Sequence, residues 1–189
     1  VNNATNGDVI RILQGTYGNL SVVGKNLTIR RHSTTPPIFA NVEVNGSTVT
    51  LIGIEVTNLN ARDTSVSTRL KVLQGNFSGI IDVNATEAHF AYCGIHRLIF
   101  DGKGTVTGCD LNGNSDGGIG ADVLGTGTQV VIRNCHIHDY KKGHSGSIDE
   151  ECIGIRVRGG ARAKIVNNVI ENCSDTDHLG HITTNTAKA

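Results

Sequence analysis

Three carboxylates and one histidine in the C-terminal half could carry acid–base chemistry. Asp116 lies in the segment NSDGGI, Asp149 and Glu150 lie in DEECIGI, and His178 lies in DHLGH. Glycoside hydrolysis needs one protonated carboxyl group and one carboxylate that activates water, and close like charges separate the two pKa values. Aligning SDGGIGADV with DEECIGIRV sets Asp116 beside Glu150. The candidate catalytic residues of a polysaccharide hydrolase are therefore Asp116, Asp149, Glu150 and His178.

The same region also permits lyase chemistry. Proton abstraction beside a uronate carboxylate needs a cation and a base. Arg156 and Arg158 are predicted to project outward from the strand 153–157, where they could bind such a carboxylate. The candidate bases are His138, Lys142 and His144. Alternatively, the two arginines are surface charges paired with Asp122 or Glu171.

A repeating strand pattern predicts how these residues are positioned. Seven segments align without helices, and the spacing between them varies, which indicates strands of constant length joined by variable loops. Residues at the same position of the aligned segments form a column, and the first column contains Ile29, Leu51, Val72, Phe90, Val106, Ile132 and Ile165. The second column, three residues later in each segment, contains His32, Ile54, Gly75, Cys93, Cys109, Cys135 and Asn168. The third column, five residues after the first, contains Thr34, Val56, Phe77, Ile95, Leu111, Ile137 and Ile170.

A second strand family lies between these segments and alternates with a period of two. The inward residues predicted from this alternation are Ile119, Ala121 and Val123, and then Ile153, Ile155 and Val157. A single coil of this kind cannot bury its own apolar face, but coils stacked about 4.8 Å apart form one continuous core. The pattern predicts an all-β chain, a parallel β-helix of about seven to eight coils, with residues 139–151 as an inserted loop.

One outward column of this repeat is polar. It contains His96, Asn112, His138 and Glu171, one residue after the third column. A spacing of about 4.8 Å per coil suits an extended polymer such as a polysaccharide, although a solvated strand face has the same composition. The candidate substrate-binding residues are His96, Asn112, His138, His144, Arg156 and Arg158. In the stretch QVVIRNCHIHD, His136 and His138 are both expected to face outward, and only His138 is expected to join this ladder.

The segments GDVIRILQGTYGNLSVVGKNLTIR, VVIRNCHIHDY and AKIVNNVIENC resemble the opening coils and the coil repeat of the pectin-lyase-like superfamily. The resemblance implies a right-handed, single-stranded parallel β-helix. The series NSDGGI, DEECIGI and DHLGH is similar to the Asn-Thr-Asp, Asp-Asp-Cys and Gly-His-Gly motifs of polygalacturonases. By that similarity Asp116, Asp149 or Glu150, and His178 hold the corresponding places. This series departs from the polygalacturonase motifs in three ways. Ser115 replaces the Thr, the histidine motif lacks the Gly-His-Gly form, and no Arg-Ile-Lys follows.

Composition limits the classes of partner. Among 189 residues the formal net charge is +0, with 24 Gly and no Trp or Met. We therefore expect a single domain, a segment of a longer chain, that binds no nucleic acid and does not insert into a membrane. With no CxxC pair and no calcium-type acidic repeat, we expect no metal and no cofactor. Cys93, Cys109 and Cys135 are expected to be buried, unreactive thiols on successive coils.

Two hypotheses for the function follow. The first is a β-helix, extracellular or at a cell or virion surface, that binds or cleaves polysaccharide. The second is a non-catalytic structural or adhesive β-helix, such as a segment of a phage fibre, a surface adhesin or a filament subunit. Open coil ends expose unpaired backbone groups, so a second copy or a neighbouring domain is expected to cap the solenoid.

Overall fold

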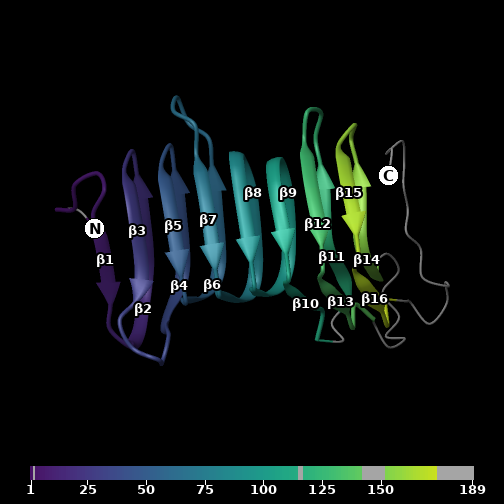
Figure 1. Cartoon of the computed structure of the whole chain (residues 1–189), viewed down its shortest axis with the longest axis horizontal. Helices are drawn as coiled ribbons and strands as arrows, with labels where there is room; N and C mark the ends of the chain where they lie inside the picture. Colours follow the sequence, from purple (N-terminus) through teal and green to yellow (C-terminus); the bar gives the residue numbers. More distant parts are fainter. Residues whose placement is uncertain (2, 115–116, 142–151, 174–189) are drawn as a thin grey trace.

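The computed structural model describes residues 1, 3–114, 117–141 and 152–173. Over these residues the chain is all-β, and its strands belong to one 16-stranded sheet whose pairings are parallel (Figure 1). The strands are β1 (Val9–Ile12), β2 (Gly15–Val23), β3 (Asn26–Arg31), β4 (Pro37–Asn45), β5 (Thr48–Ile52), β6 (Glu55–Arg62), β7 (Arg69–Leu73), β8 (Asn76–Ala91), β9 (Gly94–Thr107), β10 (Asp110–Asn112), β11 (Gly118–Leu124), β12 (Gln129–Arg133), β13 (His136–His138), β14 (Cys152–Arg158), β15 (Arg162–Val166) and β16 (Val169–Glu171).

The first predicted column is confirmed by the register of the strands. Each residue pairs with the next in the order Ile29, Leu51, Val72, Phe90, Val106, Ile132, Ile165. The strands that carry it are β3, β5, β7, the second halves of β8 and β9, β12 and β15. The chain thus returns repeatedly to the same column, which is consistent with a β-helix-like solenoid. Each return is called a coil below.

The second strand family forms another parallel stack. It runs through β2, β4, β6 and the first halves of β8 and β9, and continues in β11 and β14. Ala121 lies between Leu98 and Ile155, and Val123 lies between Phe100 and Val157. The predicted pairs Ile119–Ile153 and Asp122–Arg156 are also present.

The third predicted column is right in all but its first member. From Val56 to Ile170 its residues pair as predicted. Thr34, however, is exposed and lies after the end of β3. Phe39 pairs with Val56 in its place, because Pro36 and Pro37 extend the connection and delay the start of β4.

Single residues in the left-handed conformation make the sharp bend after the first column. Gly53 and Gly108 occupy it with φ of 64° and 60°, and Gln74, Tyr92 and Asn134 with φ of 54°, 56° and 54°. The backbone N–H of each bend residue donates to a carbonyl of the following coil. Glycine and asparagine tolerate this conformation well, which favours the bends at Gly53, Gly108 and Asn134, whereas Gln74 and Tyr92 adopt it without that preference.

The core is a stack of apolar side chains with an aromatic row in its middle. Phe90 contacts Phe77 and Phe100 edge to face, with ring centroids 6.4 Å apart in both pairs. This geometry suits the positive edge and negative face of aromatic rings. All three rings are buried, so the interior is filled by side chains and is not a channel.

The cysteine column is buried as predicted, and its thiols are free. The Cys109 thiol and burial raise the pKa of Cys135. Cys173 is only partly buried, and its pKa is raised by burial. We expect a short pulse of iodoacetamide to label Cys173 well before Cys109 and Cys135, because access and thiolate fraction limit alkylation. Peptide mass spectrometry checks this against fully labelled, denatured protein, and equal labelling rates would contradict the assignment.

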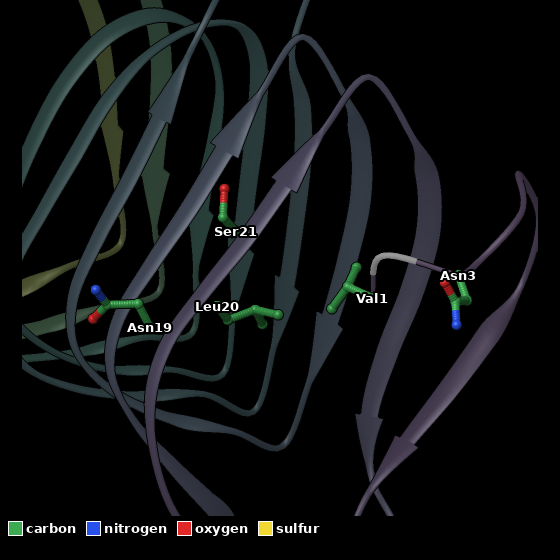
Figure 2. A pocket seen from close by; sticks show the side chains of 5 residues that line it. All are labelled: Val1, Asn3, Asn19, Leu20 and Ser21. Carbon is green, nitrogen blue, oxygen red and sulfur yellow. The ribbon is translucent and has the colours of Figure 1, made fainter.

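The N-terminal residues lie against the first coil. Lys25 Nζ donates to the carbonyl oxygens of Val1 and Ala4, at 3.1 and 2.9 Å. A hollow of about 460 Å³ lies there, and Figure 2 shows Leu20 pointing toward Val1 beside it. The residues that line it are Val1, Asn3, Asn19, Leu20 and Ser21. None has an acidic, basic or thiol side chain, so the candidate chemistry lies elsewhere.

Candidate functional site

The predicted polar ladder is assembled on successive coils. Asn112 of β10 pairs with His138 of β13, which pairs with Glu171 of β16. His96 lies one coil earlier, and its Nδ1 is 3.0 Å from the carbonyl oxygen of Asn112. Because a carbonyl only accepts, this nitrogen of His96 carries a proton. His96, Asn112 and His138 are half-buried rather than fully solvated, which gives them defined positions.

The buried side chain of Tyr140 anchors the ladder at His96. Its ring is fully buried and its hydroxyl donates to the backbone carbonyl of His96. The ring fits because two glycines border it. A Cβ at Gly113 would lie 2.7 Å from Tyr140 Cδ1, and one at Gly120 would lie 2.7 Å from Tyr140 Cε2. A side chain at either position would therefore displace the ring.

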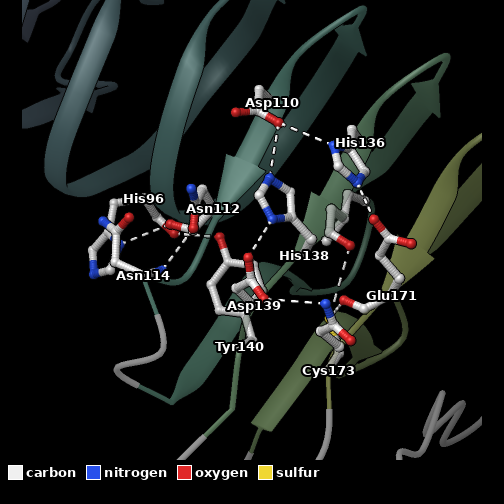
Figure 3. A network of polar contacts seen from close by, with 12 residues as sticks. His96, Asp110, Asn112, Asn114, His136, His138, Asp139, Tyr140, Glu171 and Cys173 are labelled. Atoms are coloured by element: carbon white, nitrogen blue, oxygen red, sulfur yellow. Dashed lines mark hydrogen bonds and ion pairs between the residues drawn. The ribbon is translucent and has the colours of Figure 1, made fainter.

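A cluster of two histidines and an aspartate lies beside the ladder. His136 and His138 stack with ring centroids 4.0 Å apart and an interplanar angle of 18°. Asp110 Oδ1 is 3.1 Å from His138 Nε2 and 3.5 Å from His136 Nδ1 (Figure 3). The register places only His138 in the ladder, as expected, because His136 pairs with Asp110 and Val169, but His136 contacts the ladder residues through its ring. Residues 136 and 138 point to the same side of one strand, and the stacked rings bring His136 to the same carboxylate.

The outer nitrogens of both rings are held by further carboxylates. His136 Nε2 lies 2.7 Å from Glu171 Oε1, and His138 Nδ1 lies 2.8 Å from Asp139 Oδ2. Burial lowers the pKa of His138, but its bonds to Asp139 and Asp110 outweigh this and raise the pKa above the usual value. The hydrogen bond to His138 holds the pKa of Asp139 below its usual range. Asn172 Nδ2 also donates to Asp139, at 3.2 Å.

The sequence contained a signal for this cluster that the repeat alignment left unused. Asp110 and His136 each follow a cysteine of the stacked column directly, and they pair across β10 and β13. Residues at equal offsets on successive coils stack, so a second outward column was predictable. The stacking of two rings on one strand depends on their side-chain rotamers, which no spacing rule provides.

Arg156 and Arg158 are engaged by a buried carboxylate. The Asp122 side chain is 7% exposed. Arg156 Nε and Nη2 donate to it at 3.1 and 2.8 Å, and Arg158 Nε and Nη2 donate at 3.1 and 2.9 Å. Pairing with Asp122 is one of the alternatives left open by the sequence, whereas Glu171 lies against His136. Because Asp122 is buried, removing one member of this ion pair is expected to cost more stability than breaking a surface ion pair.

Several predicted site residues lie outside the described part of the chain. These are Asp116, His144, Asp149, Glu150 and His178, together with residues 142–151 of the inserted loop. The alignment that sets Asp116 beside Glu150 depends on the register of the strands that follow. There Gly118 pairs with Cys152 and Ile119 with Ile153, as that alignment requires.

Two further findings bear on partners and relatives. In the described residues, the chain forms no helix with the length and apolar character needed to cross a membrane. Comparisons with known protein families, with curated proteins and with solved structures found no match to this chain. Function must therefore be argued from the site itself.

Proposed function

We propose that this chain is a right-handed parallel β-helix of the pectin-lyase-like type, with about seven to eight coils, that binds an extended polysaccharide. The parallel stack and the recurring left-handed bends support the architecture. We also propose that the protein is extracellular or lies at a cell or virion surface.

The single observation that carries the binding proposal is the ladder His96, Asn112, His138 and Glu171. Its members recur at successive parallel strands, about 4.8 Å apart. A regular row of hydrogen-bonding groups can contact sugar hydroxyls along a polymer, with each contact adding to the affinity. The fixed hydrogen bond of His96 and the buried ring of Tyr140 limit the freedom that the row loses on binding.

Cleavage is a second part of the proposal and rests on the carboxylates of the sequence motifs. If Asp116 and Glu150 stand on neighbouring coils, one can stay protonated while the other activates water. We expect Glu150→Gln or Asp116→Asn to abolish turnover of a bound polysaccharide. The assay follows reducing ends together with absorbance of unsaturated products, which separates hydrolysis from lyase chemistry. Turnover that persists in both variants would contradict the assignment.

Binding is tested separately from turnover. A panel of uronic-acid and neutral polysaccharides is screened by affinity electrophoresis, followed by calorimetry on any ligand found. We expect Asn112→Ala and His96→Ala to weaken binding by about 5- to 30-fold each, since each removes a hydrogen-bonding group worth about 1–2 kcal/mol.

A matched control for the binding test exists on other coils. Asn19, Asn41 and Asn58 form a second row, in which Asn41 Nδ2 donates to Asn19 Oδ1 at 2.9 Å and Asn58 Nδ2 donates to Asn41 Oδ1 at 3.3 Å. These amides bind one another, so Asn58→Ala is expected to leave polysaccharide affinity unchanged. No binding across the whole panel would refute the proposal.

A structural role is the second candidate, and the first coil favours it. Val9, Leu13 and Val23 are 57%, 62% and 60% exposed there. Among the described strands, β1 pairs only with β3 and β2 only with β4, so both present an open edge. An open edge with apolar side chains favours pairing with a further strand, from a second copy or a neighbouring domain. Concentration-dependent association in sedimentation velocity, lost on Leu13→Lys, would support this role.

A further inference from the structure

We propose that Asp110, His136 and His138 form a binding site for a divalent transition-metal ion of the Zn²⁺ class. Each offers one ligand atom, and the three atoms lie within 4.8 Å of one another. Two imidazoles and one carboxylate, with further positions open, form a donor set that suits Zn²⁺ and its neighbours in the series better than Ca²⁺ or Mg²⁺. The site shares one ligand, His138, with the polysaccharide ladder, and Glu171 of the ladder contacts its second histidine.

The distances between the ligand atoms suit one ion. Zn²⁺ lies about 2.0–2.2 Å from nitrogen and oxygen ligands, which places tetrahedral ligand atoms about 3.3 Å apart. Asp110 Oδ1 lies 3.1 Å from one imidazole nitrogen and 3.5 Å from the other. These two separations bracket the value that a shared ion requires, and the two imidazole nitrogens lie within 4.8 Å of each other, so the stacked rings must turn toward each other to bind one ion.

The hydrogen bonds of the outer nitrogens set the protonation of the inner ones. Glu171 and Asp139 only accept hydrogen bonds when ionised, so His136 Nε2 and His138 Nδ1 must carry protons. In the neutral rings, His136 Nδ1 and His138 Nε2 then present lone pairs, and both face a carboxylate oxygen. Three possible ligand atoms thus lie close together on one side of the two rings, where one cation can bind all of them.

Without a metal ion, one proton on His138 Nε2 closes the contact with Asp110 Oδ1, 3.1 Å away. A second proton, on His136 Nδ1, would place two imidazolium groups in a stack with centroids 4.0 Å apart, so that like charges repel. A single divalent ion supplies the same charge at the point where the three atoms meet. The carboxylates on the outer nitrogens match the carboxylate–histidine–metal arrangement, which orients the ring and raises its basicity.

The position in the fold also suits a preformed site. Asp110 comes from β10 and the histidines from β13, which are neighbouring strands in fixed register. The His138 side chain is 15% exposed and the His136 side chain 44%, so the site is rigid on one side and open to solvent on the other. Water or an anionic ligand group can complete the coordination from the open side.

Metal titration of the full chain tests the proposal. The protein is treated with a chelator, dialysed and titrated with Zn²⁺ in competition with a chromophoric chelator. We expect one ion per chain, and a loss of affinity of at least about 100-fold in Asp110→Asn and in His138→Ala. Glu171→Gln, which changes only the outer shell, is expected to weaken binding by about 10–100-fold. Asp110 is an exposed residue, so its variant tests the ligand set without disturbing the core.

Two controls separate this site from other ligands. His89 also contacts a carboxylate, with its Nε2 2.9 Å from Glu87 Oε1, but among the residues that the structure describes no second histidine shares this carboxylate, so His89→Ala is expected to leave affinity unchanged. Titration with Co²⁺ should give visible d–d bands without thiolate-to-metal charge transfer, which excludes the cysteines. Wild-type protein that binds no Zn²⁺, or binding that Asp110→Asn and His138→Ala leave intact, would overturn the proposal. Because no polysaccharide is used, this outcome is independent of the proposed function.

Discussion

Replacing Tyr140 with alanine is expected to lower the free energy of unfolding by about 4 kcal/mol, within the range of about 3–5 kcal/mol measured for large aromatic residues in cores. Tyr140 is fully buried, and its ring occupies the space left by Gly113 and Gly120. Neither glycine has a side chain that can fill the resulting cavity. The variant also loses the hydrogen bond to the carbonyl of His96. For a chain of this length, the expected loss in Tm is roughly 8–16 °C.

Two further tyrosine variants sharpen the test. Tyr140→Phe keeps the ring but removes the donor to His96, so its cost is expected to be about 1 kcal/mol. Tyr92→Ala truncates a side chain that is 70% exposed, and its effect is expected to stay below about 1 kcal/mol. Urea unfolding followed by circular dichroism measures all three. A loss for Tyr140→Ala no larger than that for Tyr92→Ala would show that the ring does not support the site.

Replacing Asp122 with asparagine is expected to cost about 3 kcal/mol at neutral pH. The carboxylate is buried and accepts hydrogen bonds from both Arg156 and Arg158. Removing one member of a buried ion pair costs about 3–5 kcal/mol, because the remaining charge loses the partner that offset its desolvation. We take the low end, since Arg158 is 47% exposed and water can solvate its guanidinium group.

The matched control is Asp82→Asn. Asp82 pairs with Arg62 at 3.0 Å, but both side chains are much more exposed, at 35% and 56%. Pairs of this kind contribute about 0–1 kcal/mol, so the same substitution should have a small effect there. If the two variants unfolded alike, burial of Asp122 would not be what strengthens its ion pair.

The Asp122 pair also predicts a pH dependence. Burial raises the pKa of Asp122, but the hydrogen bonds and charges of Arg156 and Arg158 outweigh it and hold the pKa below its usual range. A carboxylate with a lowered folded-state pKa adds stability above its unfolded-state pKa of about 3.9, and this stability is lost as the pH falls through the folded-state value. The difference in stability between wild type and Asp122→Asn should therefore be constant from pH 7 to about 5 and shrink below about 4. Thermal unfolding across this range measures it, and a difference that grew on acidification would contradict the assignment.

The register of the sheet was largely predictable. The apolar column from Ile29 to Ile165 pairs strand by strand as its spacing implied, and Asp122 lies beside Arg156 as the alignment required. Thr34 shows the limit of this method. A fixed offset assumes that each bend has the same length, whereas Pro36 and Pro37 lengthen one of them and move Phe39 into the column.

The candidate site was only half predictable. The ladder of His96, Asn112 and His138 follows from alternation along strands, because successive side chains point to opposite faces. The cluster with Asp110 and His136 was missed, although both residues follow a cysteine of the stacked column. We expected no metal site because no single segment has the spacing of a metal-binding motif. The residues of this cluster, however, come from two different coils.

The sequence by itself determined which residues point inward, which point outward and which stack on one another. Alternation and parallel pairing are local rules, and here they repeat in every coil, from Ile29 to Ile165. Only the tertiary structure decided that His136 and His138 stack and turn toward Asp110, with Glu171 and Asp139 behind them. That convergence depends on side-chain rotamers and on the distance between coils, which are set by packing in three dimensions and not by the order of residues along a strand.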